Sequence, residues 1–244
     1  MISYMDYTSP ATQFFFDLSN KVFYKKDDRN YIHQLGIQQL NTLGNNSLLD
    51  IYLSAGNIVE PHIHQNASEL VYCIAGAAVV SLINPFTNEL LNIPIKPGQV
   101  ANVPQGWWHY EIASVDHTHL LAVFDAPTPE AIFGSDILRL TPPSVLARSY
   151  CLDETKVAEA LAPIRETIVI GPPSGCPSSQ VQGSKTNMPH HANPSAGQTH
   201  HPSAYHRQNC VQPQTNAYQP YAHHPQQQPY APSAGYRYSR FGHL

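Results

Sequence analysis

The sequence predicts a mainly β domain of the sandwich or barrel type, followed by two short helices and a disordered tail. From residue 36 to residue 124, short apolar and polar runs alternate with turn residues, as is typical of closely spaced strands. After Phe124 the apolar residues take a helical spacing. From Pro172 onward Pro, Gln, His, Ser, Ala and Tyr dominate, and aliphatic residues are too few to offset the entropy of folding.

We therefore expect three regions in the 244 residues: an N-terminal extension over 1–35, a folded domain over 36–171 and a disordered tail over 172–244. Aromatic clusters at Phe14–Phe16 and Val22–Tyr24 suggest that the extension lays strands or turns against the β domain.

The turns between the expected strands contain residues that reverse the chain. Asn84–Asn88 holds Pro and Asn, and Lys96–Gly98 places a Pro of restricted φ before a Gly that tolerates positive φ. The nine expected strands are residues 36–43, 47–54, 58–64, 69–75, 77–83, 90–95, 100–104, 108–114 and 118–124.

Capping residues mark the two expected helices. Thr141 can cap the first, with Pro142 at its first helical position, where the missing N–H has no cost. Asp153 can cap the second, which carries Val157 and Leu161 on one side.

The charge distribution argues against a nucleic-acid-binding domain. Residues 1–171 contain 9 Lys and Arg against 17 Asp and Glu, a net charge of −8, while the tail contains 4 basic and no acidic residues. The four cysteines show no paired spacing, and neither a secretory leader nor a membrane-spanning run is evident. We expect a cytoplasmic protein, with a spore coat or cell surface as the alternative location.

Three histidines and one glutamate have the spacing of a metal site. His62 and His64 lie two residues apart, so on a strand both side chains leave the same face. A short connection can fold the strand of Glu69 back against the first, and His109 comes from a separate strand after a Pro-Gln-Gly turn. Imidazole and carboxylate ligands together suit divalent manganese, iron, nickel or zinc better than calcium or magnesium.

The surrounding residues resemble the two sequence motifs of the cupin superfamily. Gly56–Gly76 has the form Gly-x5-His-x-His-x4-Glu-x6-Gly, and Gly98–His109 has the form Gly-x5-Pro-x-Gly-x2-His. The Asn that often ends the second motif is replaced by Ala113. The resemblance implies a jelly-roll β-barrel that binds a divalent metal, most often manganese, through His62, His64, Glu69 and His109.

Residues 30–165 resemble germins and oxalate decarboxylases in particular. In germins the C-terminal helices pack between subunits, which implies a homo-oligomer formed through the barrel and the helices. Oxalate decarboxylases carry a catalytic Glu on a mobile lid, and Glu130 lies in the corresponding stretch, although that stretch is shorter here.

The alternation of side chains along a strand indicates further residues near the metal. Glu111 points inward with His109 and is a candidate proton acceptor or hydrogen-bond partner; a strand carboxylate at the barrel end is the alternative. Val71 points inward with Glu69. Trp107 and Trp108 either wall the pocket or pack at the barrel rim. A second His-x-His, at His117 and His119, is expected to be exposed and to bind nothing.

Two functions follow. The first is a manganese-dependent enzyme that binds a small anion such as oxalate and decarboxylates or oxidises it. The second is a non-catalytic structural or coat-associated cupin whose tail binds other proteins.

Overall fold

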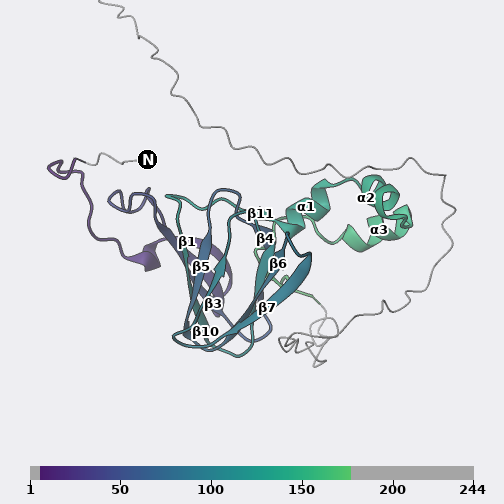
Figure 1. The fold of residues 1–244 in the computed structure, drawn as a ribbon, viewed down its shortest axis with the longest axis horizontal. Coiled ribbons are helices and arrows are strands. Elements are labelled where there is room, and N and C mark those ends of the chain that lie inside the picture. The colour runs from purple at the N-terminus through teal and green to yellow at the C-terminus, as the bar shows by residue number, and fades with distance from the viewer. Residues whose placement is uncertain (1–5, 177–244) are drawn as a thin grey trace, which may run out of the picture. The chain divides into compact units, whose positions relative to one another are not determined.

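A computed structural model describes residues 6–176, in which two antiparallel sheets face each other as a jelly-roll barrel (Figure 1). The strands are β1 Val22–Asp27, β2 Asn30–Leu35, β3 Ser47–Leu53, β4 Ile58–Ile63, β5 Glu69–Ala75, β6 Ala78–Asn84, β7 Glu89–Ile95, β8 Val100–Val103, β9 His109–Ala113, β10 Thr118–Phe124, β11 Ile132–Phe133 and β12 Ile170–Gly171. The first sheet has the order β1-β2-β3-β10-β5-β8. The second has the order β11-β4-β9-β6-β7, with β12 also paired to β4.

The barrel interior is built by alternate residues of each strand. In β5 and β10 every second residue is buried, because successive side chains of a strand point to opposite faces. Val71 and Leu120 from the first sheet meet Val80 and Leu82 from the second in one apolar core. This packing holds the strand ends rigidly enough to position polar side chains between the sheets.

Eight of the nine expected strands overlap observed strands, and the expected strand 36–43 is wrong. Gly36 to Thr42 form turns, in which the N–H groups of Gln39 and Leu40 both donate to the Gly36 carbonyl oxygen at 3.0 Å. The sheet is extended instead by β1 and β2, which belong to the predicted N-terminal extension. A 3-10 turn, η1 Leu18–Asn20, precedes them.

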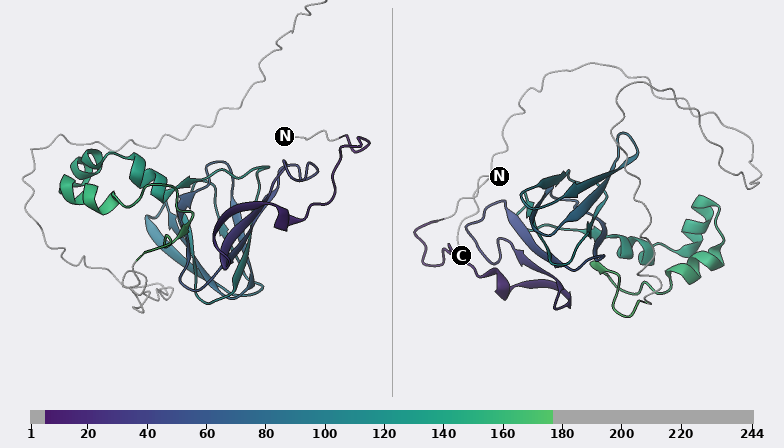
Figure 2. Two further views of the ribbon diagram at one scale, coloured as in Figure 1. Left: turned by 180° about the vertical axis from the view of Figure 1, so that it is seen from behind. Right: turned by 90° about the horizontal axis from the view of Figure 1, so that it is seen from below.

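Three helices, α1 Gly134–Leu140, α2 Pro143–Tyr150 and α3 Glu154–Leu161, lie outside the two sheets (Figure 2). The two expected helices are α2 and α3, and α1 was not expected. The predicted cap at Thr141 is wrong, because Thr141 ends α1 and Pro142 and Pro143 begin α2. The cap at Asp153 is confirmed, since its carboxylate accepts a hydrogen bond from the Lys156 N–H at 2.9 Å.

Of the predicted tail, only residues 172–176 fall within the part of the chain that the structure describes. In that part, no helix has the length and apolar character that crossing a membrane requires.

Candidate metal centre

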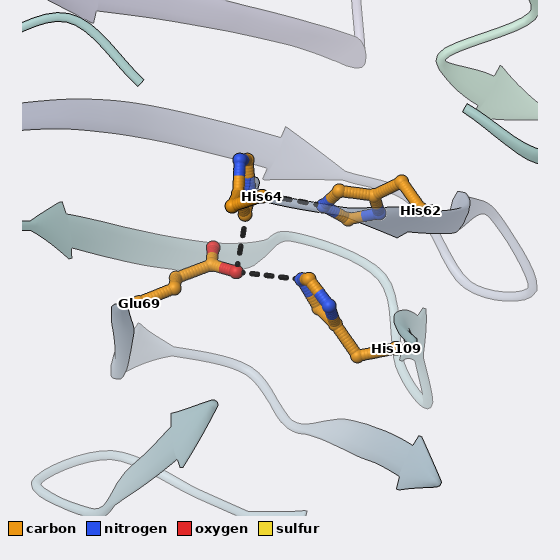
Figure 3. Close-up of side chains that lie close together, drawn as sticks. All are labelled: His62, His64, Glu69 and His109. Atoms are coloured by element: carbon orange, nitrogen blue, oxygen red, sulfur yellow. Dashed lines mark hydrogen bonds and ion pairs between the residues drawn. The ribbon is translucent and has the colours of Figure 1, made fainter. Parts of the chain in front are cut away.

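The four predicted ligands converge inside the barrel, where each side chain is almost fully buried (Figure 3). His62 lies near the end of β4, His64 directly after it, Glu69 at the start of β5 and His109 at the start of β9. One ligand atom from each residue lies within 4.8 Å of those from the other three. Such a cluster has the dimensions of a single-ion site.

A β-bulge in β4 aims His62 into the barrel. Val59 lies opposite Glu111 and His62 opposite His109, so three residues of β4 span the distance of two residues of β9. The additional residue turns the following side chains to the other face. Val59 and His62 are therefore both buried, and the Glu60 carboxylate reaches Ser135 in α1.

Backbone carbonyls orient all three imidazole rings. The Nδ1 atom of His62 lies 2.7 Å from the Glu60 carbonyl oxygen, that of His64 2.9 Å from Glu130 and that of His109 2.8 Å from Trp107. A carbonyl oxygen can only accept, so each Nδ1 carries the proton and each neutral ring presents an Nε2 lone pair. This is how a metal-binding imidazole is usually held.

The Nε2 lone pairs face one another and the Glu69 carboxylate. His62 Nε2 lies 3.1 Å from His64 Nε2, and Glu69 Oε2 lies 2.8 Å from His109 Nε2 and 3.6 Å from His64 Nε2. Four electron-donating atoms without protons between them repel one another, and a shared cation removes that repulsion. The donor set therefore fits a divalent metal ion.

The pKa shifts favour the metal-binding protonation state at His62 and Glu69, but not at His64. Burial lowers the pKa of His62 to about 3, so this ring is neutral at pH 7. Burial alone raises the pKa of Glu69, but in the ion-free protein His109 and His64, when protonated at Nε2, outweigh it and hold the pKa below its usual value. For His64 burial lowers the pKa, and the contacts with Glu69 reverse this and raise it. Protons therefore compete with the metal for the Nε2 atom of His64.

Glu111 lies beside the four ligands, and within residues 6–176 its carboxylate has no hydrogen-bond partner. It is 1% exposed, neither carboxylate oxygen is hydrogen-bonded, and Oε1 lies 3.8 Å from His109 Nε2. Burial and then the charge of Glu69 raise the pKa of Glu111 well above its usual value. Glu111 lies outside the group of four residues whose ligand atoms converge. It is thus a neighbour of the ion site.

A cavity of about 220 Å³ opens onto the ligand cluster. Its polar lining consists of His62, His64, Glu69 and Gln34. The remaining lining residues are apolar: Phe23, Ile32, Leu49, Ile51, Val59, Pro129, Ala131, Phe133 and Val169. An ion held by the cluster is therefore accessible to a small ligand.

The sequence model of the cupin family matches residues 29–158. The chain belongs to the cupin family. Germin-like protein 1-2 of Oryza sativa subsp. japonica is 29% identical over 123 residues, which are 48% of this chain and 54% of that protein. Legumin type B of Vicia faba is 29% identical over 110 residues, which are 45% of this chain and 33% of that protein.

Solved structures share the cupin fold. Oxalate decarboxylase from Bacillus subtilis, solved at pH 4.6, superposes with a TM-score of 0.58 at 22% identity and covers 70% of this chain and 46% of its own. The coconut allergen cocosin gives the same TM-score at 22% identity, over 63% of this chain and 42% of its own. This cupin spans about half the length of the germin-like relatives that it matches.

In this cupin Glu130 contributes its backbone to the ligand cluster and directs its carboxylate elsewhere. Its carbonyl oxygen accepts from His64 Nδ1, and its exposed carboxylate lies 3.2 Å from Gln65 Nε2. The backbone of Glu130 therefore orients the His64 ring, while its carboxylate contacts Gln65.

The predicted pocket residues lie around the cluster but outside the cavity lining. Val71 is fully buried in the core, Trp107 is half-buried against it, and Trp108 packs against Gly134. Within the second His-x-His, His117 is exposed as expected. The expectation of an exposed His119 is wrong, because it lies in β10, half-buried, with Nε2 2.5 Å from Asp50 Oδ1.

Two features of the centre were not predicted from the sequence. One is the set of backbone carbonyls that orient the imidazoles, and the other is the cavity wall formed by Phe23, Ile32 and Gln34 from β1 and β2. Residues of any type provide carbonyls, so no side-chain pattern marks them. The alternation of Ile32 and Gln34 is the available signal, since both point inward from β2.

Proposed function

We propose that this cupin is a manganese-dependent enzyme that acts on a small carboxylate, with oxalate as the first substrate to assay. The observation that carries the proposal is the convergence of three Nε2 atoms and the Glu69 carboxylate beside an open cavity. Four protein ligands leave about two positions of an octahedral ion for substrate or water. The similarity to germin-like proteins and to the fold of oxalate decarboxylase supports oxalate as the starting point.

In this proposal the chain's residues hold the ion and shape its surroundings. When bound, the ion supplies positive charge that binds and polarises a carboxylate and supports one-electron chemistry. His62, His64, Glu69 and His109 provide the ligands, and the apolar walls restrict water. Glu111 is the nearest further carboxyl to the ligand atoms and serves as the proton acceptor or hydrogen-bond partner. Glu130, whose carboxylate is exposed and bonded to Gln65, is the second candidate for proton transfer.

The test begins with the metal content of protein expressed with added manganese, measured by mass spectrometry. The loaded protein is then incubated with oxalate and oxygen while formate, carbon dioxide and peroxide are followed. Formate indicates decarboxylation and peroxide indicates oxidation. The Glu69→Gln variant is the matched control, because it changes one ligand without altering side-chain volume. A fully loaded protein that turns over no small carboxylate contradicts the enzymatic proposal.

The second candidate is a structural cupin that assembles through its surface. Its support is a group of strongly exposed apolar side chains on and beside the helices, with Leu140 67%, Tyr150 69% and Leu152 53% exposed. A second such group on the outer face of the first sheet contains Leu70, Tyr72, Ile74 and Val100. Exposed apolar groups of this kind mark protein interfaces, and we propose that a second copy of the chain covers them. Both candidates are compatible with such a homo-oligomer.

A further inference from the structure

The cavity beside the ligand cluster contains no positively charged side chain. Its lining includes neither Lys nor Arg, and Gln34 is its one polar residue besides the ligands. Within the described residues, the only source of positive charge that a ligand in this cavity would meet is therefore the ion itself. A negative charge distant from the ion would lie among apolar walls, where an unpaired charge is strongly unfavourable.

The charges of the cluster favour a ligand with one negative charge. When the three Nε2 atoms bind the ion, each imidazole keeps only the Nδ1 proton that faces a carbonyl oxygen and is neutral. A divalent ion with the Glu69 carboxylate therefore has a local charge of about +1. One ligand carboxylate neutralises it, whereas a second carboxylate that lies away from the ion has no partner in the cavity lining.

The walls favour an apolar body attached to that carboxylate. Ile32, Ile51 and Val59 are at most 5% exposed, and Leu49 and Phe133 pack against the same core. The cavity volume of about 220 Å³ lies below the roughly 300–1,000 Å³ of sites for drug-sized ligands. It therefore suits a body of only a few carbon atoms.

We propose that the cavity selects monoanionic 2-hydroxy or 2-oxo acids with a short apolar body, and that it disfavours dianions whose second carboxylate lies away from the ion. The carboxylate and the adjacent oxygen would bind the ion held by the four ligands, and the body would lie among Ile32, Leu49 and Phe133. This inference rests on the proposed metal-dependent function and narrows its substrate class.

The test is calorimetric titration of the manganese-loaded full chain with acids that share one head group. Across glycolate, lactate, 2-hydroxybutanoate and 2-hydroxypentanoate, affinity should rise about two- to fourfold with each methylene. The decisive pair is 2-hydroxypentanoate and 2-hydroxyglutarate, which differ in a terminal methyl or carboxylate. The monoanion should bind at least tenfold more tightly. Equal affinities along the series, or tighter binding of 2-hydroxyglutarate, overturn the inference, and so does a chain that binds no ion.

A charge placed in the cavity wall should reverse the preference. In Gln34→Arg a cation faces the cavity, so 2-hydroxyglutarate should gain at least tenfold in affinity relative to 2-hydroxypentanoate. Gln38→Arg is the control, because Gln38 is exposed and lies outside the cavity lining. If Gln34→Arg does not fold, the relative affinities of 2-hydroxypentanoate and 2-hydroxyglutarate for the unmodified chain still test the inference. Binding with the expected preference but without turnover contradicts the enzymatic proposal alone, while turnover with a flat affinity series contradicts this inference alone.

Discussion

Glu60 and His62, two residues apart on β4, connect the ligand cluster to the C-terminal segment. The Glu60 carbonyl oxygen accepts from His62 Nδ1 at 2.7 Å. The Glu60 carboxylate accepts from the Ser135 hydroxyl at 2.7 Å, and from the N–H groups of Ser135 and Val169 at 2.9 Å each. One residue thus orients a ligand ring and attaches α1 and the segment before β12 to the barrel.

Glu60→Gln should destabilise the fold by about 1–3 kcal/mol, because the amide nitrogen faces buried donors that then lack an acceptor. Urea unfolding of the metal-free protein measures the loss. Ser135→Ala is the control that removes the hydroxyl donor and leaves the carboxylate intact, and it should cost about 1 kcal/mol. A Glu60→Gln variant as stable as the parent would show that this carboxylate contributes nothing to the attachment.

Glu69→Gln should remove most of the metal affinity. The amide does not neutralise the charge of the ion, and its N–H group can donate to His109 Nε2 and so occupy the lone pair that the metal would bind. The loss should exceed the roughly 10- to 100-fold expected for residues that only support a ligand. Thermal unfolding with and without manganese provides the measurement, since an ion at 100 times its Kd stabilises by about 2.7 kcal/mol. Retention of this stabilisation in the variant would argue against Glu69 as a ligand.

Glu111→Leu should stabilise the metal-free protein by about 1–3 kcal/mol, because it replaces a buried carboxyl without partners by an apolar side chain of similar size. Glu111→Gln should gain less, since its amide remains unpaired. The same Leu variant should bind manganese about tenfold more weakly if Glu111 supports a group on the ion. Chemical unfolding and metal titration measure the two effects separately. A less stable Glu111→Leu protein would contradict the first expectation.

The ligand cluster was predictable from the sequence because its members have distinctive chemistry at a characteristic spacing. His62, His64, Glu69 and His109 needed only the two-residue period of strands and the short connection between β4 and β5. The bulge between Val59 and His62 was not predictable, since it depends on how β4 pairs with β9.

The errors arise where tertiary contacts override local patterns. Gly36 begins a turn because its neighbour Ile37 donates to the Pro127 carbonyl oxygen, a contact 90 positions along the chain. Thr141 resembles an N-cap, yet its hydroxyl donates to the Ile137 carbonyl oxygen and ends α1. Such choices depend on partners that a local pattern does not contain.

Replacing Leu140, Tyr150 and Leu152 together by Ser should reduce the oligomeric state. These apolar side chains are exposed in the single chain, and we propose that contact with a second copy buries them. Light scattering coupled to size exclusion measures the mass, and circular dichroism checks the helices. Phe86→Ser is the control, because Phe86 is 86% exposed in the turn between β6 and β7. A monomeric parent protein would contradict the assembly proposal.

His62 should contribute a loss of stability to the metal-free protein on acidification from pH 6 to pH 5, while the raised pKa of Glu111 contributes a gain over the same range. The pKa of His62 is about 3 in the folded state and about 6.5 in the unfolded chain. Between these values the unfolded chain binds a proton that the folded state excludes, so this residue contributes a loss of up to about 1.4 kcal/mol per pH unit. The raised pKa of His64 acts in the opposite sense, stabilising the fold as the pH falls, but only above about pH 6.5. The depressed pKa of Glu69 removes stability only below about pH 4.5.

Urea unfolding in the presence of a chelator at pH 6.0, 5.5 and 5.0 gives the slope. His62→Gln is the matched variant, because it retains a polar side chain that does not titrate. On acidification its free energy of unfolding should fall less than that of the parent, by up to about 1.4 kcal/mol per pH unit. The other histidines and Glu111 are present in both proteins, so their contributions cancel in the comparison. Identical slopes would mean that His62 accepts a proton in the folded state, and the lone pair assigned to its Nε2 would then not be free for a metal at this pH.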